Sequence, residues 1–283
     1  MAHYTFSINN QSGEPASYGI FSEAPTIDPP PFKVQTRIIS AVHAVPSPHG
    51  QATIMLPKGY YATCGVYDID SEPDDPNAVQ GRATTGTEVI DNRTVQLTSP
   101  VNATVKSVGS SLWVDCKTGT PRFSEKPAGD LSPAVIANPG CFAVRTSSDF
   151  TSTKAKSNKF FLGYTSSLRH SIGPHAMFTP LPEQTYNIKP STTFYVAVRD
   201  AEPRDPVDPA LLGKPTCKVD FAALARDHVL LIHRDNGTLT VNAVSDESEP
   251  PVFARVLDLS VNGASVASEN EEQEQEQEPA SES

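Results

Sequence analysis

The segments DSEPDDPNAVQGR (residues 70–82) and DAEPRDPVDPALLGK (residues 200–214) share one unusual pattern. Each contains Glu-Pro-x-Asp-Pro, then a short stretch, then glycine and a cation. Proline cannot donate a hydrogen bond to a β ladder, and it pushes the preceding residue towards extended geometry, so each segment predicts a loop that leaves a sheet. The glycine then allows the chain to turn back into a following strand.

The residues that flank these two loops also repeat, and they do so in the same order. YYATCGVYD (60–68) precedes the first loop and FYVAVRD (194–200) precedes the second. Each loop ends within a Gly-cation-x-Thr stretch (81–84 and 213–216), and a segment that ends in RTVQL or DHVLL comes after it. Further upstream, HAVPSPHGQATIML (43–56) corresponds to HSIGPHAMFTPL (170–181). Because the order is preserved at an offset near 130 residues, the sequence predicts an internal duplication of one β unit.

The pattern between the loops is typical of an all-β protein. The 26 prolines and 16 glycines interrupt the chain too often for long helices. The segments between them alternate or are rich in β-branched and aromatic residues. Short strands at this spacing predict a sandwich or barrel, with a helical turn around 222–226. We predict strands at 4–8, 18–21, 36–42, 52–56, 60–67, 94–98, 104–108, 112–116, 142–146, 160–164, 194–198, 217–221, 229–233 and 239–241.

These features divide the chain into two tandem, internally duplicated modules that are sandwich-like or barrel-like. The first module is predicted at 1–118 and the second at 141–244, joined by a Pro-rich connector at 119–140. An extra strand is predicted at 245–263. The acidic, Gln-rich tail at 264–283 cannot bury enough apolar surface to offset its ordering entropy, so we expect it to be disordered.

Composition and charge exclude several classes of protein. An apolar content of 37% is enough to build a core. The net charge is -11, and seven of the carboxylates lie in the last fifteen residues, which leaves -4 for the body. Such a body lacks the basic field that nucleic acid requires. The chain begins without a signal-peptide pattern and contains no run of about 18 apolar residues, so we predict a cytoplasmic protein that does not bind membranes.

Metals and cofactors receive little support from the sequence. The four cysteines form no C-x-x-C pair and are expected to be buried small hydrophobes. The acidic loops could hold Ca²⁺, but neither matches an EF-hand. His43 and His49 recur as His170 and His175, yet the two spacings differ, which favours turn or surface roles over a metal site. We therefore predict no metal and no cofactor.

Aromatic doublets are the strongest candidates for a ligand site. Adjacent strand residues point to opposite faces of a sheet, so one ring of each doublet enters a core. The other ring needs a second apolar surface, which is either the interface between modules or a bound ligand. The predicted ligand-binding residues are Tyr60, Tyr61, Phe194, Tyr195, Trp113 and Phe161.

Three functions from different classes are compatible with this sequence. It contains no G-x-S-x-G, phosphate-loop, G-x-G-x-x-G or H-E-x-x-H motif, so hydrolytic and nucleotide-dependent chemistry have no support. The first hypothesis is a binding protein, monomeric or homodimeric, for a small, largely apolar ligand or a glycan, held at or between the modules. The second is a cofactor-independent cyclase or isomerase, with His170, His175, Tyr195 and Asp200 as candidate catalytic residues. The third is a structural, self-associating protein.

The shape of the site can distinguish the first two hypotheses. A closed apolar cavity favours chemistry, whereas a shallow exposed groove favours recognition.

Overall fold

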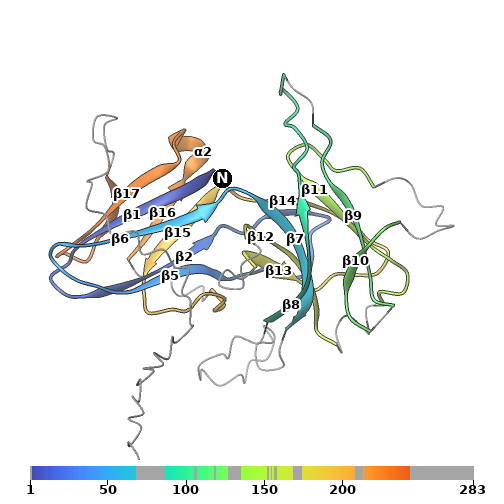
Figure 1. Ribbon diagram of the computed structural model, residues 1–283, viewed down its shortest axis with the longest axis horizontal. Coiled ribbons are helices and arrows are strands. Elements are labelled where there is room, and N and C mark those ends of the chain that lie inside the picture. Colours follow the sequence, from blue (N-terminus) through green and yellow to red (C-terminus); the bar gives the residue numbers. More distant parts are fainter. Residues whose placement is uncertain are drawn as a thin grey trace, which may run out of the picture.

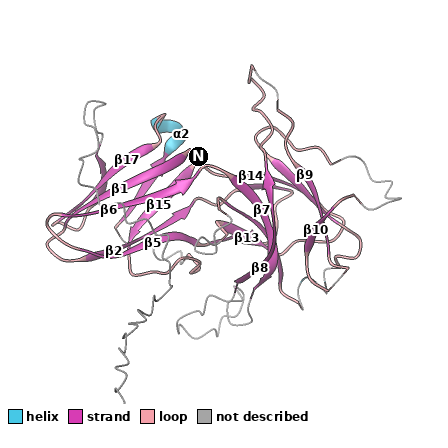
Figure 2. Cartoon of the chain, viewed as in Figure 1, coloured by secondary structure: helices cyan, strands magenta, loops and turns pink. Residues whose placement is uncertain are grey.

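A computed structural model describes residues 2–67, 87–104, 107–117, 119–126, 135–151, 153, 155, 158–167, 174–207, 213 and 215–242. These residues form four β-sheets and one short helix, which confirms the all-β prediction (Figure 2). No helix among them is long and apolar enough to cross a membrane. The second tract with the proline pattern is described as far as residue 207, whereas 70–82, 245–263 and 264–283 lie outside the described residues.

The first sandwich consists of two four-stranded sheets, at the left of Figure 1. One sheet has the order β18-β17-β1-β6, with β1 (His3–Gln11), β6 (Gly50–Pro57), β17 (His228–Arg234) and β18 (Leu239–Asn242). The other has the order β16-β15-β2-β5, with β2 (Ala16–Ser22), β5 (Ile38–Val45), β15 (Thr193–Val198) and β16 (Thr216–Asp220). The short helix α2 (Phe221–Leu224) follows β16, and the Asp220 carboxylate caps it by accepting hydrogen bonds from two of its backbone N–H groups.

The second sandwich consists of two five-stranded sheets, at the right of Figure 1. One has the order β10-β9-β11-β14-β3, with β3 (Thr26–Asp28), β9 (Ser111–Asp115), β10 (Arg122–Ser124), β11 (Phe142–Thr146) and β14 (Thr185–Lys189). The other has the order β4-β13-β12-β7-β8, with β4 (Gln35–Thr36), β7 (Tyr60–Tyr67), β8 (Thr87–Val95), β12 (Phe160–Thr165) and β13 (Ala176–Phe178).

Each sandwich has its own hydrophobic core, built from alternating residues of the facing strands. Phe6 and Ile8 of β1 point into the first core together with Phe194 of β15. Phe142 of β11 and Phe160 of β12 point into the second core. Burying a side chain of this size stabilises the fold by about 1.5–3 kcal/mol. The two-residue period of the strands therefore selects which side chains form each core.

The chain passes from one sandwich to the other and back. Strands β1 and β2 belong to the first sandwich, β3 and β4 to the second, β5 and β6 to the first, β7 to β14 to the second, and β15 to β18 to the first again. The predicted ranges 1–118 and 141–244 therefore each supply strands to both sandwiches. Strand β10 lies within the range predicted as the connector. The limits of the two repeated modules remain a prediction from the sequence. In the structure, each of the four sheets contains strands from both 1–118 and 141–244.

The two sandwiches have matching strand orders. The order β18-β17-β1-β6 corresponds to β10-β9-β11-β14, and β16-β15-β2-β5 corresponds to β8-β7-β12-β13. Each sandwich also contains one parallel pair at the same place, β1 with β17 and β11 with β9. The remaining strands, β3 and β4, are additional edges of the second sandwich.

The register of the strands matches as well. Gly19 of β2 pairs with Ala197 of β15, and Gly163 of β12 pairs with Thr63 of β7. Tyr195 and Tyr61 each lie two residues before these partners. The doublets Phe194-Tyr195 and Tyr60-Tyr61 thus occupy equivalent positions, and the sandwiches can be compared residue by residue.

The two sandwiches meet where β4 continues directly into β5 through Arg37. The Arg37 backbone N–H donates to the His175 carbonyl at 3.1 Å, and its guanidinium donates to the Arg204 carbonyl at 3.2 Å. Tyr164 and Ser22 place their hydroxyls 3.4 Å apart across the same junction. Burial lowers the pKa of Arg37 to about 10, partly offset by the carboxylate of Asp205, so Arg37 stays charged at neutral pH.

Candidate functional site

An open hollow of about 700 Å³ lies at one end of the first sandwich. The turn between β1 and β2, the end of β15 and the end of β17 meet around it. It is an open depression rather than an enclosed chamber. Its lining combines small apolar residues with charged and hydroxyl-bearing ones: Ser12, Gly13, Glu14, Pro15, Ala16, Ser17, Val198, Arg199, Asp200 and His233.

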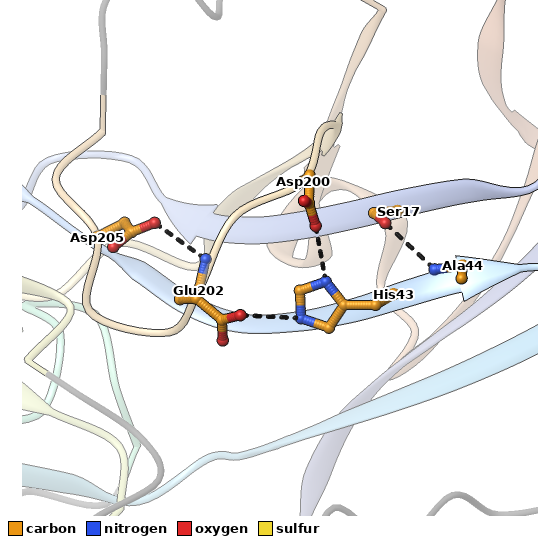
Figure 3. Close-up of polar contacts among 6 residues, drawn as sticks. All are labelled: Ser17, His43, Ala44, Asp200, Glu202 and Asp205. Atoms are coloured by element: carbon orange, nitrogen blue, oxygen red, sulfur yellow. Dashed lines mark hydrogen bonds and ion pairs between the residues drawn. The ribbon is translucent and has the colours of Figure 1, made fainter. Parts of the chain in front are cut away.

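A β-bulge shapes the edge of this hollow. Ala16 pairs with Val45 and Tyr18 pairs with Val42, so two residues of β5, His43 and Ala44, lie opposite Ser17 alone. Ala44 has a φ of 48°, and its N–H donates to the Ser17 Oγ at 3.2 Å. A bulge of this kind bends the strand and re-aims its side chains. Here it directs His43 away from the paired part of the strand, towards the loop that follows β15 (Figure 3).

His43 contacts two carboxylates of that loop. Its Nδ1 lies 2.9 Å from Asp200 Oδ1, and its Nε2 lies 3.8 Å from Glu202 Oε1 (Figure 3). All three side chains are exposed, and pairs of this kind contribute at most about 1 kcal/mol each. The contacts therefore position Asp200 at the rim of the hollow more than they stabilise the fold.

The loop is the second Glu-Pro-x-Asp-Pro segment, and residues 200–207, which we name the strap, fold back over β5. Ile38 donates its backbone N–H to the Asp205 carbonyl at 2.8 Å, and Arg204 donates to the Ile38 carbonyl at 2.7 Å. Glu202 donates its N–H to the Asp205 carboxylate at 3.0 Å. The predicted loop is confirmed for this segment, and it is held against the sheet rather than extended into solvent.

Ser17, His43 and Asp200 are the residue types of a catalytic triad, but their geometry is different. The Ser17 Oγ faces the Ala44 N–H, whereas both nitrogens of His43 face carboxylates (Figure 3). In a triad, the histidine nitrogen that is not bound to the carboxylate must face the serine. The arrangement therefore does not activate Ser17 as a nucleophile.

A buried polar pair borders the hollow, since His233 is one of its lining residues. Tyr18 Oη and His233 Nδ1 are 3.0 Å apart, and both side chains are almost fully buried. Burial raises the pKa of Tyr18 to about 12 and lowers the pKa of His233, so both groups are neutral at neutral pH. A neutral, hydrogen-bonded pair can be buried at little cost.

The second sandwich has apolar residues at these two positions. Leu162 precedes Gly163 as Tyr18 precedes Gly19. Asn10 of β1 and Thr146 of β11 are equivalent, because each is buried and donates a side-chain hydrogen bond to the carbonyl of Val45 or Leu181, at or just past the ends of the corresponding strands β5 and β13. Asn10 pairs with His233, and Thr146 pairs with Val114. Leu162 and Val114 both belong to the second core. The first sandwich therefore carries a polar pair where its counterpart is purely hydrophobic.

Two lining residues, Ser17 and Arg199, which we name the floor of the hollow, differ between the sandwiches in the same way. Ser17 and Arg199 are cross-strand neighbours, joined by the Arg199 N–H and the Ser17 carbonyl at 2.8 Å. The equivalent pair in the second sandwich is Phe161 and Gly65. Phe161 is fully buried there, and its Cε1 would lie 2.9 Å from a Cβ placed on Gly65. A phenyl ring thus fills the position that serine leaves open in the first sandwich.

The structure distributes the predicted ligand residues over several places. Phe194 is buried in the first core, where its ring packs against Phe6 and Phe221. Tyr195 lies half-buried on the opposite face of β15, stacked on Phe21 with ring centroids 5.2 Å apart. This doublet confirms that one ring enters the core while the other packs on a second apolar surface.

The other predicted ligand residues belong to the second sandwich. Trp113 is buried, with the Arg145 guanidinium 5.4 Å from its ring centroid, and Phe161 is fully buried. Tyr60 is half-buried against the second core, and Tyr61 is half-buried. None of these rings lines the hollow described above. Their ligand-binding role stays a prediction.

The candidate catalytic residues also lie apart. His175 is buried at the junction of the sandwiches, with its Nε2 2.8 Å from Ser166 Oγ, and burial lowers its pKa to about 3. Tyr195 lies on the outer face of β15, and His170 lies outside the described residues. Asp200 lines the hollow. Sequence reasoning did not select Ser17, Arg199 or His233, because only strand register brings them together.

Metal ligands do not gather in the part of the chain that the structure describes. No group of three or more His, Cys, Asp or Glu side chains there is arranged to hold an ion. The prediction of buried cysteines is confirmed: Cys64, Cys116, Cys141 and Cys217 are buried and form no disulfide.

A scan against protein-family models finds no match for this chain, and searches of the curated proteins and of the solved structures also return none.

Proposed function

We propose that this chain is a binding protein that recognises a small ligand in the hollow of its first sandwich. The observation that carries the proposal is the difference between equivalent positions. Ser17 and Arg199 replace Phe161 and Gly65 at the floor of the hollow. Tyr18 and His233 likewise replace Leu162 and Val114 at its border. Apolar residues pack these places well in the second sandwich, so stability alone does not require polar ones.

We also propose that the two sandwiches derive from one duplicated β unit. Matching strand orders, a parallel pair at the same place in each sandwich and aromatic doublets in the same register support this origin. In this view one copy kept or acquired a ligand site, and the other filled the corresponding space with Phe161. The duplication therefore explains why the hollow occurs on one sandwich of a matched pair.

The shape and lining of the hollow favour a glycan over a purely apolar ligand. The hollow is open, which suits recognition of an exposed group better than enclosure of a reactive intermediate. Pro15, Ala16 and Val198 offer small apolar surfaces, and Ser17 and Arg199 offer hydrogen-bond donors beside them. A sugar ring has both kinds of surface.

The strands around the hollow hold its residues in a fixed geometry. Arg199 follows β15 directly, and its backbone is bonded to β2. Ser17 is fixed by that bond and by the Ala44 N–H. A preformed site of this kind avoids part of the entropy cost of ordering side chains on binding.

Saturation-transfer NMR and thermal-shift measurements with a panel of sugars and apolar metabolites test the proposal. Ser17→Phe installs the residue of the second sandwich and should block the part of the hollow next to residue 17 and Arg199, so binding there should be lost. Ser111→Phe makes the same change at an exposed position of β9 and should bind as the unmodified chain does. Backbone amide shifts on binding should centre on Gly13 and Arg199. The proposal fails if no compound in the panel binds, or if Ser17→Phe binds as tightly as Ser111→Phe.

A further inference from the structure

The residues at the floor of the hollow indicate the chemical class of its ligand, an inference that rests on the function proposed above. We infer that the hollow binds an anionic sugar, and that Arg199 and Ser17 together bind its carboxylate or phosphate group.

Arg199 is a half-buried cation without a partner in the described structure. Its backbone N–H bonds to Ser17, but its guanidinium makes no hydrogen bond or ion pair with any described residue. Elsewhere, the Arg37 guanidinium donates to Arg204 and Gln35, and Arg93 lies 3.7 Å from Asp91. The planar guanidinium presents a fork of N–H donors that matches a carboxylate or a phosphate.

Ser17 supplies a second donor beside Arg199. Its Oγ accepts the Ala44 N–H, and its own O–H is given to no described acceptor. Directly opposed residues of an antiparallel pair have Cβ atoms about 4.5–5.5 Å apart, so one ligand group can reach both side chains. The Arg199 guanidinium carries donors alone and the Ser17 O–H adds another, so together they favour a group that accepts hydrogen bonds. An ionised acid group meets this requirement better than a sugar hydroxyl does.

The carboxylates near the hollow do not neutralise Arg199. Asp200 directs its Oδ1 to His43 at 2.9 Å, on the strap side of the rim. Glu14 is exposed on the turn between β1 and β2, where solvent and salt screen its charge. Its oxygens can accept hydrogen bonds from sugar hydroxyls while the acid group lies against Arg199.

Three matched probes test this assignment by isothermal titration and saturation-transfer NMR: galactose, galacturonate and galactose 6-phosphate. At low salt, at least one of the two acidic probes should bind about tenfold more tightly than galactose, and added salt should reduce the difference. Tighter binding of galacturonate identifies a carboxylate ligand, and tighter binding of the phosphate identifies a phosphorylated one. Arg199→Gln should abolish the preference, Arg199→Lys should keep part of it, and Ser17→Ala should reduce it.

Arg122→Gln removes the same charge from an exposed position of β10 and should leave binding unchanged. Thermal melting of every variant checks that it is folded. If galactose and both acids bind equally, or if Arg199→Gln keeps the preference, the anionic assignment is overturned while binding at the hollow stands. If none of the three probes nor any compound of the wider panel binds, both proposals fail together.

Discussion

Acid should destabilise this protein through His175, which is buried where the two sandwiches meet. The backbone N–H of His175 donates to the Tyr164 carbonyl at 2.8 Å, and the backbone carbonyl of His175 accepts the Arg37 N–H. The ring Nε2 of His175 faces Ser166 Oγ. Burial lowers the pKa of His175 from 6.5 to about 3. In the unfolded chain the ring binds a proton near pH 6.5, whereas in the folded chain it does so only near pH 3. The unfolded state therefore holds more protons between these values, and stability falls as the pH falls through this window.

The size of the effect follows from the shift. One proton bound only by the unfolded state changes the free energy of unfolding by about 1.4 kcal/mol per pH unit. Between pH 7.5 and 4.5 the contribution of His175 is therefore about 3 kcal/mol, a large share of the about 5–15 kcal/mol that stabilises a typical domain. The contribution is fully present above pH 6.5.

Urea unfolding at pH 7.5, 6.5, 5.5 and 4.5 measures this directly. His175→Gln keeps a hydrogen-bonding group near Ser166 but cannot titrate, so its stability should fall less steeply below pH 6.5, by about 1 kcal/mol per pH unit. His49→Gln, at an exposed position, should retain the slope of the unmodified chain. The comparison of slopes is independent of any packing loss at pH 7.5. Parallel slopes for His175→Gln and His49→Gln would refute the reasoning.

Three further outcomes are expected. Gly163→Ala should lower the free energy of unfolding in denaturant by on the order of 2–4 kcal/mol, because the new Cβ would collide with the Ala176 carbonyl. Gly19→Ala at the equivalent position places its Cβ 3.4 Å from Ile38 Cδ1 and should change stability by less than about 1 kcal/mol, so equal losses in the two variants would contradict the register. Cleavage at a protease site inserted between β10 and β11 should leave two fragments that co-elute in size-exclusion chromatography, because both sandwiches use strands from both fragments. The fragments should separate only in denaturant, and separation under native conditions would contradict the strand orders. The four cysteine thiols should react with a thiol reagent only on unfolding, since all four are buried and burial raises the pKa of Cys141 and Cys217. Rapid labelling of the folded protein would contradict this expectation.

Sequence reasoning located the strands whose pattern is strong and missed those defined by their partners. The predictions at 60–67 and 142–146 coincide with β7 and β11, where β-branched and aromatic residues follow one another. β13 is only three residues long and is fixed by pairing with β12 and β4. Of the predicted strand at 104–108, residues 104, 107 and 108 are not strand, and 105 and 106 lie outside the described residues. Local pattern identifies a strand when its own side chains favour one, but not when neighbours impose it.

The hollow could not be predicted because its residues carry no local signal. Ser17 and Arg199 meet only through the pairing of β2 with β15, and His43 turns towards Asp200 only because of the bulge at Ala44. Aromatic doublets carry the stronger sequence signal, but their rings tend to be buried because burying them stabilises a fold most. Comparing equivalent positions of the two sandwiches identifies the polar exceptions, and that comparison requires the register.

The short links between strands explain why each sandwich combines strands from both halves of the chain. β6 ends at Pro57 and β7 begins at Tyr60, so the three peptide steps between them reach about 10–11 Å. Within the first sandwich, β6 lies over β5, and the position of β15 is two strands further along the facing sheet. Two strand spacings of about 4.8 Å and a sheet separation of about 10 Å place that position about 14 Å away. The link is too short for β7 to return there, so the chain continues into the other sandwich, and β15 fills the vacant position from the second half.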